Sequence, residues 1–249
     1  MTLAIVSALI EEQVGLRRQL EQAREDHLAR RSFVQGQLNK QPVVLALCGI
    51  GKVAAATTTA LLIERLGVTR ILFTGVAGGL HAAAQVGDVV VASELLQHDM
   101  NASPIFPRYE VPLTGLSRFP ADVAMTQTLQ AACAQTLAED AELLDHLHHY
   151  RGDARTPQSH TGLIVSGDQF IQSQAHSDDL RQRLPDALAV EMEGAAVAQV
   201  CHDHDVPFAV MRTISDRADA KALGDFLGFV REVASLSSEH MVLRWLAQN

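Results

Sequence analysis

Short runs of consecutive apolar residues recur along the chain, separated by glycine turns and amphipathic stretches. Runs of this kind are typical of strands in a sheet that is covered on both faces. The predicted strands comprise residues 3–8, 33–38, 42–47, 70–74, 89–92, 161–165, 187–190 and 208–214, with a turn at Asn39-Lys40. The pattern therefore predicts a largely buried sheet.

Apolar positions with helical spacing lie between these runs. The clearest helix is Lys52–Leu66, and Gly67 is expected to end it. Its predicted buried face consists of Val53, Ala56, Thr57, Ala60 and Leu61. The other predicted helices are residues 11–25, 121–144, 193–202 and 224–248. Strands that alternate with helices in this way indicate an α/β fold.

The middle of the chain lacks this regularity. Residues 98–120 contain four prolines and predict an irregular excursion, and the polar residues 146–160 predict an exposed loop. We find no internal repeat and no linker clean enough to divide the chain. We therefore expect one domain over residues 1–249, with a variable excursion at about residues 100–160.

Composition narrows the classes of function. Of 249 residues 47% are apolar, and 20 basic against 29 acidic residues leave a net charge of −9. This balance argues against a nucleic-acid partner, which needs clustered lysine and arginine. Neither a stretch of roughly 18 apolar residues nor a basic export signal is present, so we expect no membrane partner. Three cysteines without C-x-x-C spacing indicate a reduced, cytoplasmic protein.

Two glycine-rich segments resemble phosphate-binding motifs without matching them. Residues 49–52 read Gly-Ile-Gly-Lys, but the first glycine and the final Ser or Thr of a P-loop are missing. Residues 75–79 do not form G-x-G-x-x-G. We interpret both segments as tight turns at the ends of strands, which is where ligands bind in open α/β sheets.

Other residues with chemical potential are interpreted as structural. Residues 146–149 contain three histidines without a partner at metal-ligand spacing, so we expect a solvated loop and no metal. The adjacent side chains of His98 and Asp99 point to opposite faces of an extended backbone, which favours a structural hydrogen-bonding role. Cys48 and Cys201 border apolar stretches and are expected to be unreactive core thiols.

Carboxylates at the ends of predicted strands carry a sharper signal. Glu12 follows the first strand, Glu193 follows residues 187–190, and Asp216 follows residues 208–214. A single acid at such a position is explained by its favourable interaction with a first helical turn. Three acids at equivalent topological positions predict a functional site at one edge of the sheet.

Seven segments together carry a resemblance to one enzyme family. Residues 8–12, 49–55 and 86–90 contribute, as do Thr-Gly-Val-Ala-Gly-Gly-Leu at 74–80, Val-Ser-Gly-Asp-x-Phe-Ile at 165–171, Val-Glu-Met-Glu-Gly-Ala-Ala at 190–196 and Arg-x-Ile-Ser-Asp at 212–216. Outside about residues 100–160, the chain resembles 5′-methylthioadenosine/S-adenosylhomocysteine nucleosidases. The resemblance implies the nucleoside phosphorylase-like fold, a single α/β domain with a mixed, twisted sheet flanked by helices, usually in a homodimer.

The resemblance also implies the chemistry. Members of this family hydrolyse the N-glycosidic bond to adenine through a ribosyl oxocarbenium-like transition state, and they need no metal or organic cofactor. Asp216 matches the general acid that protonates adenine, Glu12 matches the residue that activates water, and Arg212 matches a residue that orients both Glu12 and the water. A free Asp has a pKa of about 3.9, so a proton donor at neutral pH needs an upward shift.

The remaining matches imply a nucleoside-binding pocket. They are Glu193 and Met192 for the sugar, Phe170 and Ile171 for adenine, Ser215 beside Asp216, and Leu9, Ile50 and Phe226 around the sugar and the 5′-substituent. Two positions depart from the family pattern, since Val76 replaces a Ser near the water and Leu9 replaces a Met. In the family the partner subunit closes the 5′ pocket through an aromatic residue, a role that Ile105 or Phe106 is positioned to take here.

Three alternative functions stay open at the level of sequence. A phosphorylase of the same fold would need arginines around the phosphate. A nucleosidase for another 5′-substituted nucleoside, such as a futalosine-type menaquinone precursor, would use the same acids. A non-catalytic nucleoside-binding protein would not need Glu12, Glu193 and Asp216 together.

Overall fold

Eleven strands form one continuous sheet in the computed structural model, which describes residues 2–248. The strand order is β2-β3-β4-β1-β5-β11-β6-β10-β9-β7-β8. The strands are β1 Leu3–Ser7, β2 Glu21–Leu28, β3 Arg31–Leu38, β4 Gln41–Leu47, β5 Arg70–Phe73, β6 Val76–Gly79, β7 Val89–Gln97, β8 Phe119–Pro120, β9 Ser159–Ser166, β10 Ala187–Glu191 and β11 Phe208–Asp216. Parallel and antiparallel pairs both occur, which confirms the predicted mixed α/β sheet.

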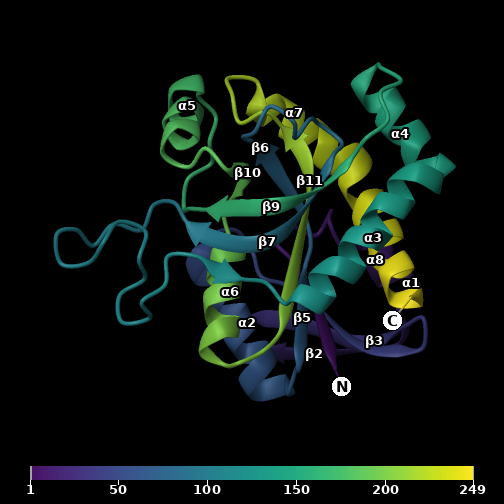
Figure 1. Ribbon diagram of the computed structural model, residues 1–249. Helices are drawn as coiled ribbons and strands as arrows, with labels where there is room; N and C mark the ends of the chain where they lie inside the picture. The colour runs from purple at the N-terminus through teal and green to yellow at the C-terminus, as the bar shows by residue number, and fades with distance from the viewer. Residues whose placement is uncertain (1, 249) are drawn as a thin grey trace.

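Strand β11 joins the two halves of this sheet. Its first residues, Phe208–Val210, pair in parallel with β5, and its later residues pair with β7 and β6. Figure 1 shows β11 running across the molecule between β5 and the group formed by β6, β7, β9 and β10. The carboxyl end of β11, at Asp216, therefore lies among the strands of the second half of the sheet.

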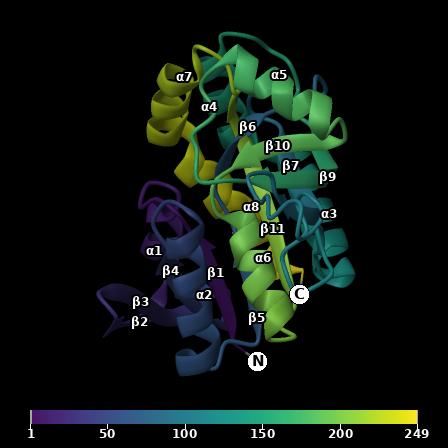
Figure 2. The same cartoon turned by 90° about the vertical axis from the view of Figure 1, so that its left-hand side faces the viewer.

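Helices cover both faces of the sheet. They are α1 Val14–Gln19, α2 Lys52–Leu66, α3 Val123–Glu139, α4 Ala141–Arg151, α5 Gln174–Arg183, α6 Gly194–Asp203, α7 Ala222–Phe229 and α8 Ser235–Ala247. Figure 2 shows α2 and α6 side by side on one face, while α3 and α8 share the other side of the molecule in Figure 1. Strand β1 shows why, because Ala4 and Val6 pack into one core, whereas Leu3 and Ile5 pack into the other.

The expected helix at residues 11–25 is wrong beyond Gln19. Residues 21–28 form the exposed edge strand β2, which pairs antiparallel with β3. Most of β2 is charged and solvent-exposed, so its sequence carries no strand alternation. Pairing with β3 therefore determines its conformation, and local propensity does not.

Helix α2 has the predicted bounds, but the predicted buried face is wrong in part, since Ala56 and Leu61 pack against the core only partly buried. The residues that the helix buries are Ala55, Thr58, Thr59 and Leu62. The hydroxyls of Thr58 and Thr59 donate to carbonyl oxygens four residues earlier, at 3.0 and 2.9 Å, so both side chains are buried without an unpaired polar group. Val53, which we expected to be buried, is 78% exposed.

The predicted exposed loop at residues 146–160 is also wrong in part. Helix α4 extends to Arg151, and β9 begins at Ser159. Leu143 and Leu147 are the two residues that α4 buries, too few to reveal the helix among its polar neighbours. Residues 76–79, interpreted as part of a turn, form the short strand β6. The C-terminal helix is present as α7 and α8, joined by the π-helical turn Val230–Ala234.

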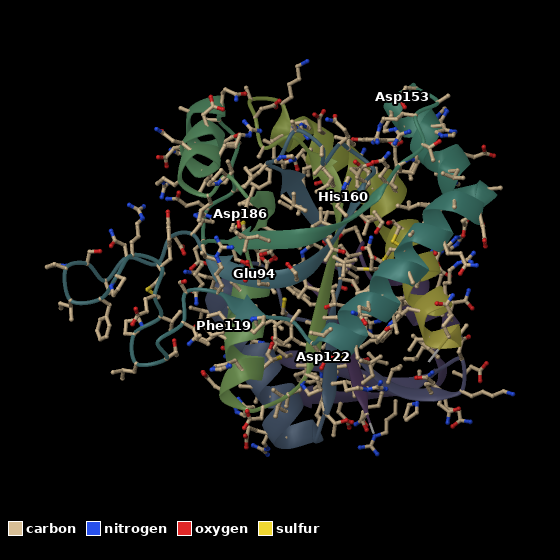
Figure 3. All side chains as sticks on the ribbon, in the orientation of Figure 1. Glu94, Phe119, Asp122, Asp153, His160 and Asp186 are labelled. Atoms are coloured by element: carbon tan, nitrogen blue, oxygen red, sulfur yellow. The ribbon has the colours of Figure 1, made fainter. Side chains whose placement is uncertain are left out.

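The segment between β7 and β8 is irregular, as its prolines predict, and extends away from the body of the molecule (Figure 1, left). Arg118 fixes its returning end through ion pairs with Glu94 at 2.6 Å and Asp186 at 2.7 Å. Glu94 and Asp186 are labelled on this side of the molecule in Figure 3. Ile105 and Leu113, both in this segment, are 81% and 94% exposed.

No helix among residues 2–248 is both long and apolar enough to span a membrane.

Candidate active site

A cleft of about 480 Å³ lies at the carboxyl ends of β10 and β11 and is bordered by α7. Its volume is within the usual range for small-molecule sites. The residues that line it are Ala8, Leu9, Glu12, Ile50, Val76, Gly78, Gln169, Phe170, Ile171, Gln172, Val190, Glu191, Met192, Glu193, Ser215, Asp216, Leu223 and Phe226. The predicted acids Glu12, Glu193 and Asp216 thus meet in one cleft.

Glu12 follows β1 and is held by backbone donors. Its Oε2 accepts from the N–H groups of Ala8 at 3.0 Å and Leu9 at 2.9 Å, and its Oε1 accepts from Val76 N–H at 3.1 Å. These bonds position the carboxylate and favour its ionised form. Burial acts in the opposite direction and raises the pKa of Glu12 above its ordinary value. The result is a fixed carboxylate that binds a proton more readily than a solvated one.

Asp216 is the last residue of β11. Its Oδ2 accepts from the Ser215 hydroxyl at 2.8 Å, and its Oδ1 accepts from Ala218 N–H at 2.8 Å. Burial raises the pKa of Asp216, and these two hydrogen bonds offset only part of that shift. Asp216 is therefore a positioned carboxyl group with an increased tendency to carry a proton.

Glycines of the segment 75–79 make room for both acids. A Cβ at Gly75, where φ is +147°, would lie 2.6 Å from Glu12 Oε1, and a Cβ at Gly78 would lie 2.9 Å from Asp216 Oδ1. Glu12 and Asp216 thus contact the segment 75–79 at two glycines three residues apart. At the rise of a strand, three residues span roughly 10 Å. The segment is more than a tight turn, because its missing side chains create the space in which the carboxyl groups lie.

Arg212 lies behind the cleft, fully buried, and its direct partner is Glu191. The Arg212 Nη2 and Glu191 Oε2 atoms are 2.7 Å apart, and the guanidinium lies over the ring of Phe73. Glu191 Oε1 and Oε2 also accept from the backbone N–H of Gly194, and the Ser166 hydroxyl donates to Oε1. A Cβ at Gly75 would lie 3.1 Å from Arg212 Nη1, which places this cation next to Glu12.

The start of α2 binds two carboxylates instead of a phosphate. Gly51 N–H donates to Glu193 Oε1 at 2.8 Å, and Lys52 N–H donates to Asp168 Oδ1 at 2.8 Å. Unpaired N–H groups at the start of a helix favour negative charge. The bond from Gly51 fixes Glu193, and the bond from Lys52 to Asp168 joins α2 to the loop after β9 that carries Phe170.

The other wall of the cleft is apolar. The rings of Phe170 and Phe226 meet edge to face, with centroids 5.5 Å apart. Ile171 and Met192 line the same cleft, as do Leu9 and Ile50, and Ile50 is 57% exposed at its rim. The cleft therefore offers a flat aromatic surface beside carboxylates, an arrangement suited to a base attached to a polar sugar.

The structure brings together nearly all the predicted site residues. The exceptions are Arg212, which lies behind the cleft, and Ile105 and Phe106, which lie in the segment between β7 and β8 and do not line it. Sequence reasoning assigned no role to Glu191, the partner of Arg212. Its spacing was the available signal, since Glu191 and Glu193 are two residues apart at a strand end, where alternate residues share a side.

Residues interpreted as structural show no competing site. Burial raises the pKa of the Cys48 and Cys201 thiols, so neither is a reactive thiolate. Asp99 pairs with Lys52 at 2.6 Å and accepts from Asp168 N–H, as a structural role predicts, whereas His98 Nε2 has no hydrogen-bond partner in the described chain. Within residues 2–248 no cluster of three or more His, Cys, Asp or Glu could hold a metal ion.

We expect Glu193→Gln to stabilise the protein at pH 8. Burial, reinforced by the nearby Glu191 carboxylate, raises the pKa of Glu193 to about 8, whereas an unfolded Glu titrates near 4.5. As the pH rises from 4.5 to 8, ionisation of Glu193 therefore stabilises the unfolded wild type relative to the folded wild type. The free energy of unfolding of Glu193→Gln should therefore exceed that of wild type by a margin that grows by up to about 1.4 kcal/mol per pH unit over this window. Thermal melts of both proteins at pH 4.5 and pH 8 measure it, and an advantage independent of pH would contradict it.

Matches to known proteins cover nearly the whole chain, including the sheet and the cleft described above. Residues 2–247 match the model of the phosphorylase superfamily. A 5′-methylthioadenosine/S-adenosylhomocysteine nucleosidase of Anoxybacillus flavithermus is 37% identical over 96% of this chain and 95% of its own length.

Solved structures agree with the sequence comparison. The Neisseria meningitidis nucleosidase of the same name, in complex with methylthio-immucillin-A, has a TM-score of 0.88 at 33% identity and covers 100% of this chain and 99% of its own. Futalosine hydrolase of Helicobacter pylori has a TM-score of 0.84 at 29% identity, covering 100% and 98%. The chain belongs to the phosphorylase superfamily and, within it, to the 5′-methylthioadenosine/S-adenosylhomocysteine nucleosidases, which makes it a purine nucleosidase.

Proposed function

We propose that the protein hydrolyses the N-glycosidic bond of 5′-methylthioadenosine and S-adenosylhomocysteine, releasing adenine and the thioribose product. The observation that carries this proposal is the pair of buried carboxyl groups, Glu12 beside Gly75 and Asp216 beside Gly78, in one cleft. Burial raises the pKa of both groups, which suits them to proton transfer near neutral pH.

Asp216 acts as the general acid. Adenine is a poor leaving group as an anion, so protonation at N7 lowers the barrier to breaking the bond to C1′. The Ser215 hydroxyl and the Ala218 N–H orient the Asp216 carboxyl group, so that only its proton moves when it is transferred to adenine. Phe170, which Phe226 contacts edge to face, provides the stacking surface for the purine, and the backbone of Ile171 reads its edge.

Glu12 acts as the general base for the attacking water. Three backbone N–H groups occupy part of its acceptor capacity and aim the rest into the cleft. The Val76 contribution comes from its N–H, so this contact does not depend on the side chain at position 76. Arg212 pairs with Glu191 and also lies next to Glu12, where its positive charge favours the ionised form of that carboxyl group. An acid on one side of the bond and a base on the other follow the logic of glycosidases that use water directly.

Glu193 and Met192 hold the ribose. Glu193 accepts hydrogen bonds from the ribose hydroxyls, and the positive charge that develops on the sugar favours its ionised form despite burial. No cofactor is needed, since protonation and water activation suffice. The described residues that line the cleft include no lysine or arginine, which favours water over phosphate as the nucleophile.

A second copy of the chain completes the site. Leu9, Ile50 and Phe226 form the 5′ side of the cleft, and Ile50 is open to solvent there. Val53, nearby on α2, is also exposed, as are Ile105 and Leu113 on the segment between β7 and β8. We assign this segment of the partner subunit, through Ile105 or Phe106, to the closing of the 5′ pocket.

A homodimer has a direct test. Light scattering after gel filtration should give twice the mass of one chain. Ile105→Asp should weaken association, because an exposed apolar side chain at an interface core would become a buried charge. The same change should raise KM for methylthioadenosine. A wild-type monomer with full activity would contradict the shared pocket.

The choice of 5′-substituent separates this proposal from its main alternative. The similarity to futalosine hydrolase favours a second candidate, hydrolysis of a futalosine-type nucleoside with the same acids. Release of the free base should be measured for methylthioadenosine, S-adenosylhomocysteine, adenosine and futalosine. A kcat/KM highest for the two thio-substituted nucleosides supports the proposal. A preference for futalosine would reassign the substrate, and nucleoside binding without release would indicate a binding protein.

The cellular setting follows from the same proposal. Three buried, unpaired cysteines suit the reducing cytoplasm. Removal of the adenine from methylthioadenosine would place the reaction in methionine salvage.

A further inference from the structure

Helix α7 borders the substrate cleft, packs against β11 and continues through the π-helical turn Val230–Ala234 into α8. Phe226 and Leu223 line the cleft from this helix. Ala222 and Phe229 are the residues that it buries, while Leu223 and Leu227 remain 52% and 51% exposed. The connection to α8 anchors the C-terminal end of α7, whereas the part that carries Leu223 and Phe226 buries little surface and depends on additional contacts to hold one position.

Helix α4 supplies an additional contact to α7 at Tyr150. The Tyr150 hydroxyl donates to the backbone carbonyl of Asp225 at 2.6 Å, one residue before Phe226. Its ring meets Phe229 edge to face, with centroids 5.4 Å apart. A Cβ at Gly228 would lie 3.1 Å from the Tyr150 hydroxyl oxygen, so the absence of a side chain there lets the phenol lie against the helix.

Helix α4 is itself firmly placed. Asp140 caps its first turn by accepting from Leu143 N–H at 3.0 Å and pairs with His240 of α8 at 2.6 Å. After the helix, Arg155 pairs with the buried Asp88 at 2.8 Å, and His160 of β9 contacts the same carboxylate. Figure 3 shows Asp153 in the turn after α4 and His160 on β9 beneath it. Tyr150 is thus presented by a helix fixed at both ends.

We propose that α4 is a clamp for α7 and that Tyr150 is a positioning residue that holds the closing helix over the substrate cleft. The clamp keeps Phe226 beside Phe170 before substrate binds, so α7 does not have to move into the closed position during binding. A ligand that binds only the closed form has an apparent Kd equal to its intrinsic Kd divided by the closed fraction. This inference rests on the proposed function only for its kinetic readout.

Two substitutions test the clamp from opposite sides. Tyr150→Phe removes the hydrogen bond to Asp225, and Gly228→Ala presses a methyl group against the phenol. Gly224→Ala is the matched control, because it makes the same change on α7 at a position with no atom within 4 Å of the added Cβ. KM and kcat for methylthioadenosine, melting temperature, and amide hydrogen exchange of residues 222–229 are to be compared with wild type.

We expect Tyr150→Phe and Gly228→Ala to raise KM by up to about fivefold, the largest change in closed fraction that the loss of one hydrogen bond produces, with kcat within about twofold of wild type. Exchange of the α7 amides should accelerate in Tyr150→Phe relative to wild type. In Gly228→Ala it should be faster than in Gly224→Ala, which gains the same helix propensity without touching Tyr150 and should keep the wild-type KM. The clamp would be overturned if KM and exchange were unchanged in Tyr150→Phe and Gly228→Ala. It would also be overturned if both variants lost kcat and melting temperature together, as a general destabilisation does. If the wild type releases no adenine, the proposed function fails, and exchange of α7 still decides the clamp.

Discussion

Asp216→Asn is expected to lower kcat by at least about 10²-fold, the range of general-acid catalysis. Asparagine has nearly the same shape, and its amide oxygen can still accept from Ala218 N–H. The Ser215 hydroxyl can rotate and accept from the new amide. The variant therefore loses the proton while keeping the fold and the cleft, so adenine affinity should stay within a few fold of wild type.

Asp219→Asn is the matched control for this result, since it makes the same change in the same turn, outside the cleft, and removes only the smallest of the effects that raise the pKa of Asp216. The pH profile gives a second signature. The general acid works only while protonated, so wild-type kcat/KM should fall as the pH rises through the raised pKa of Asp216. Near-normal kcat in Asp216→Asn, or no alkaline fall in wild type, would refute the assignment.

Glu12→Gln should also reduce kcat at least about 10²-fold, because an amide cannot remove a proton from water. The base works only when ionised, so wild-type activity should also fall as the pH drops below the raised pKa of Glu12. Adenine binding should persist in the variant, since Phe170 and Asp216 are unchanged. Steady-state rates over a pH series, together with adenine titrations, measure both effects.

The fold of Glu12→Gln needs its own check. The carboxylate accepts from three N–H groups with both oxygens, so the amide nitrogen must face at least one donor. That mismatch costs about 1–3 kcal/mol, offset in part by removal of a buried charge. Glu11→Gln, at the adjacent exposed position, is the control. Full hydrolysis by a folded Glu12→Gln protein would exclude Glu12 as the base.

The meeting of Glu12, Glu193 and Asp216 was predictable because each follows an apolar strand, and the topology of α/β sheets brings such ends together. Strand β2 and helix α4 were not predictable. The first has no apolar alternation, and the second buries two leucines among charged and histidine residues. Both are set by contacts with distant segments, which a local pattern does not contain.

The contact between Arg212 and Glu191 shows the same limit within the site. The resemblance assigned Arg212 to the orientation of Glu12, whereas the structure pairs it with a carboxylate 21 positions earlier. Only the adjacency of β10, β6 and β11 brings these residues together. The buried face of α2 was missed for a related reason, because Thr58 and Thr59 satisfy their hydroxyls within the helix and so count as core residues.

The identity of the nucleophile is the central claim, and labelled water tests it most directly. Methylthioadenosine is incubated with the protein in ¹⁸O-water, with and without phosphate, and the sugar product is analysed by mass spectrometry. We predict adenine release at the same rate in both buffers and one ¹⁸O atom in methylthioribose. Release that requires phosphate, with formation of a sugar 1-phosphate, would contradict water activation by Glu12 and make the protein a phosphorylase.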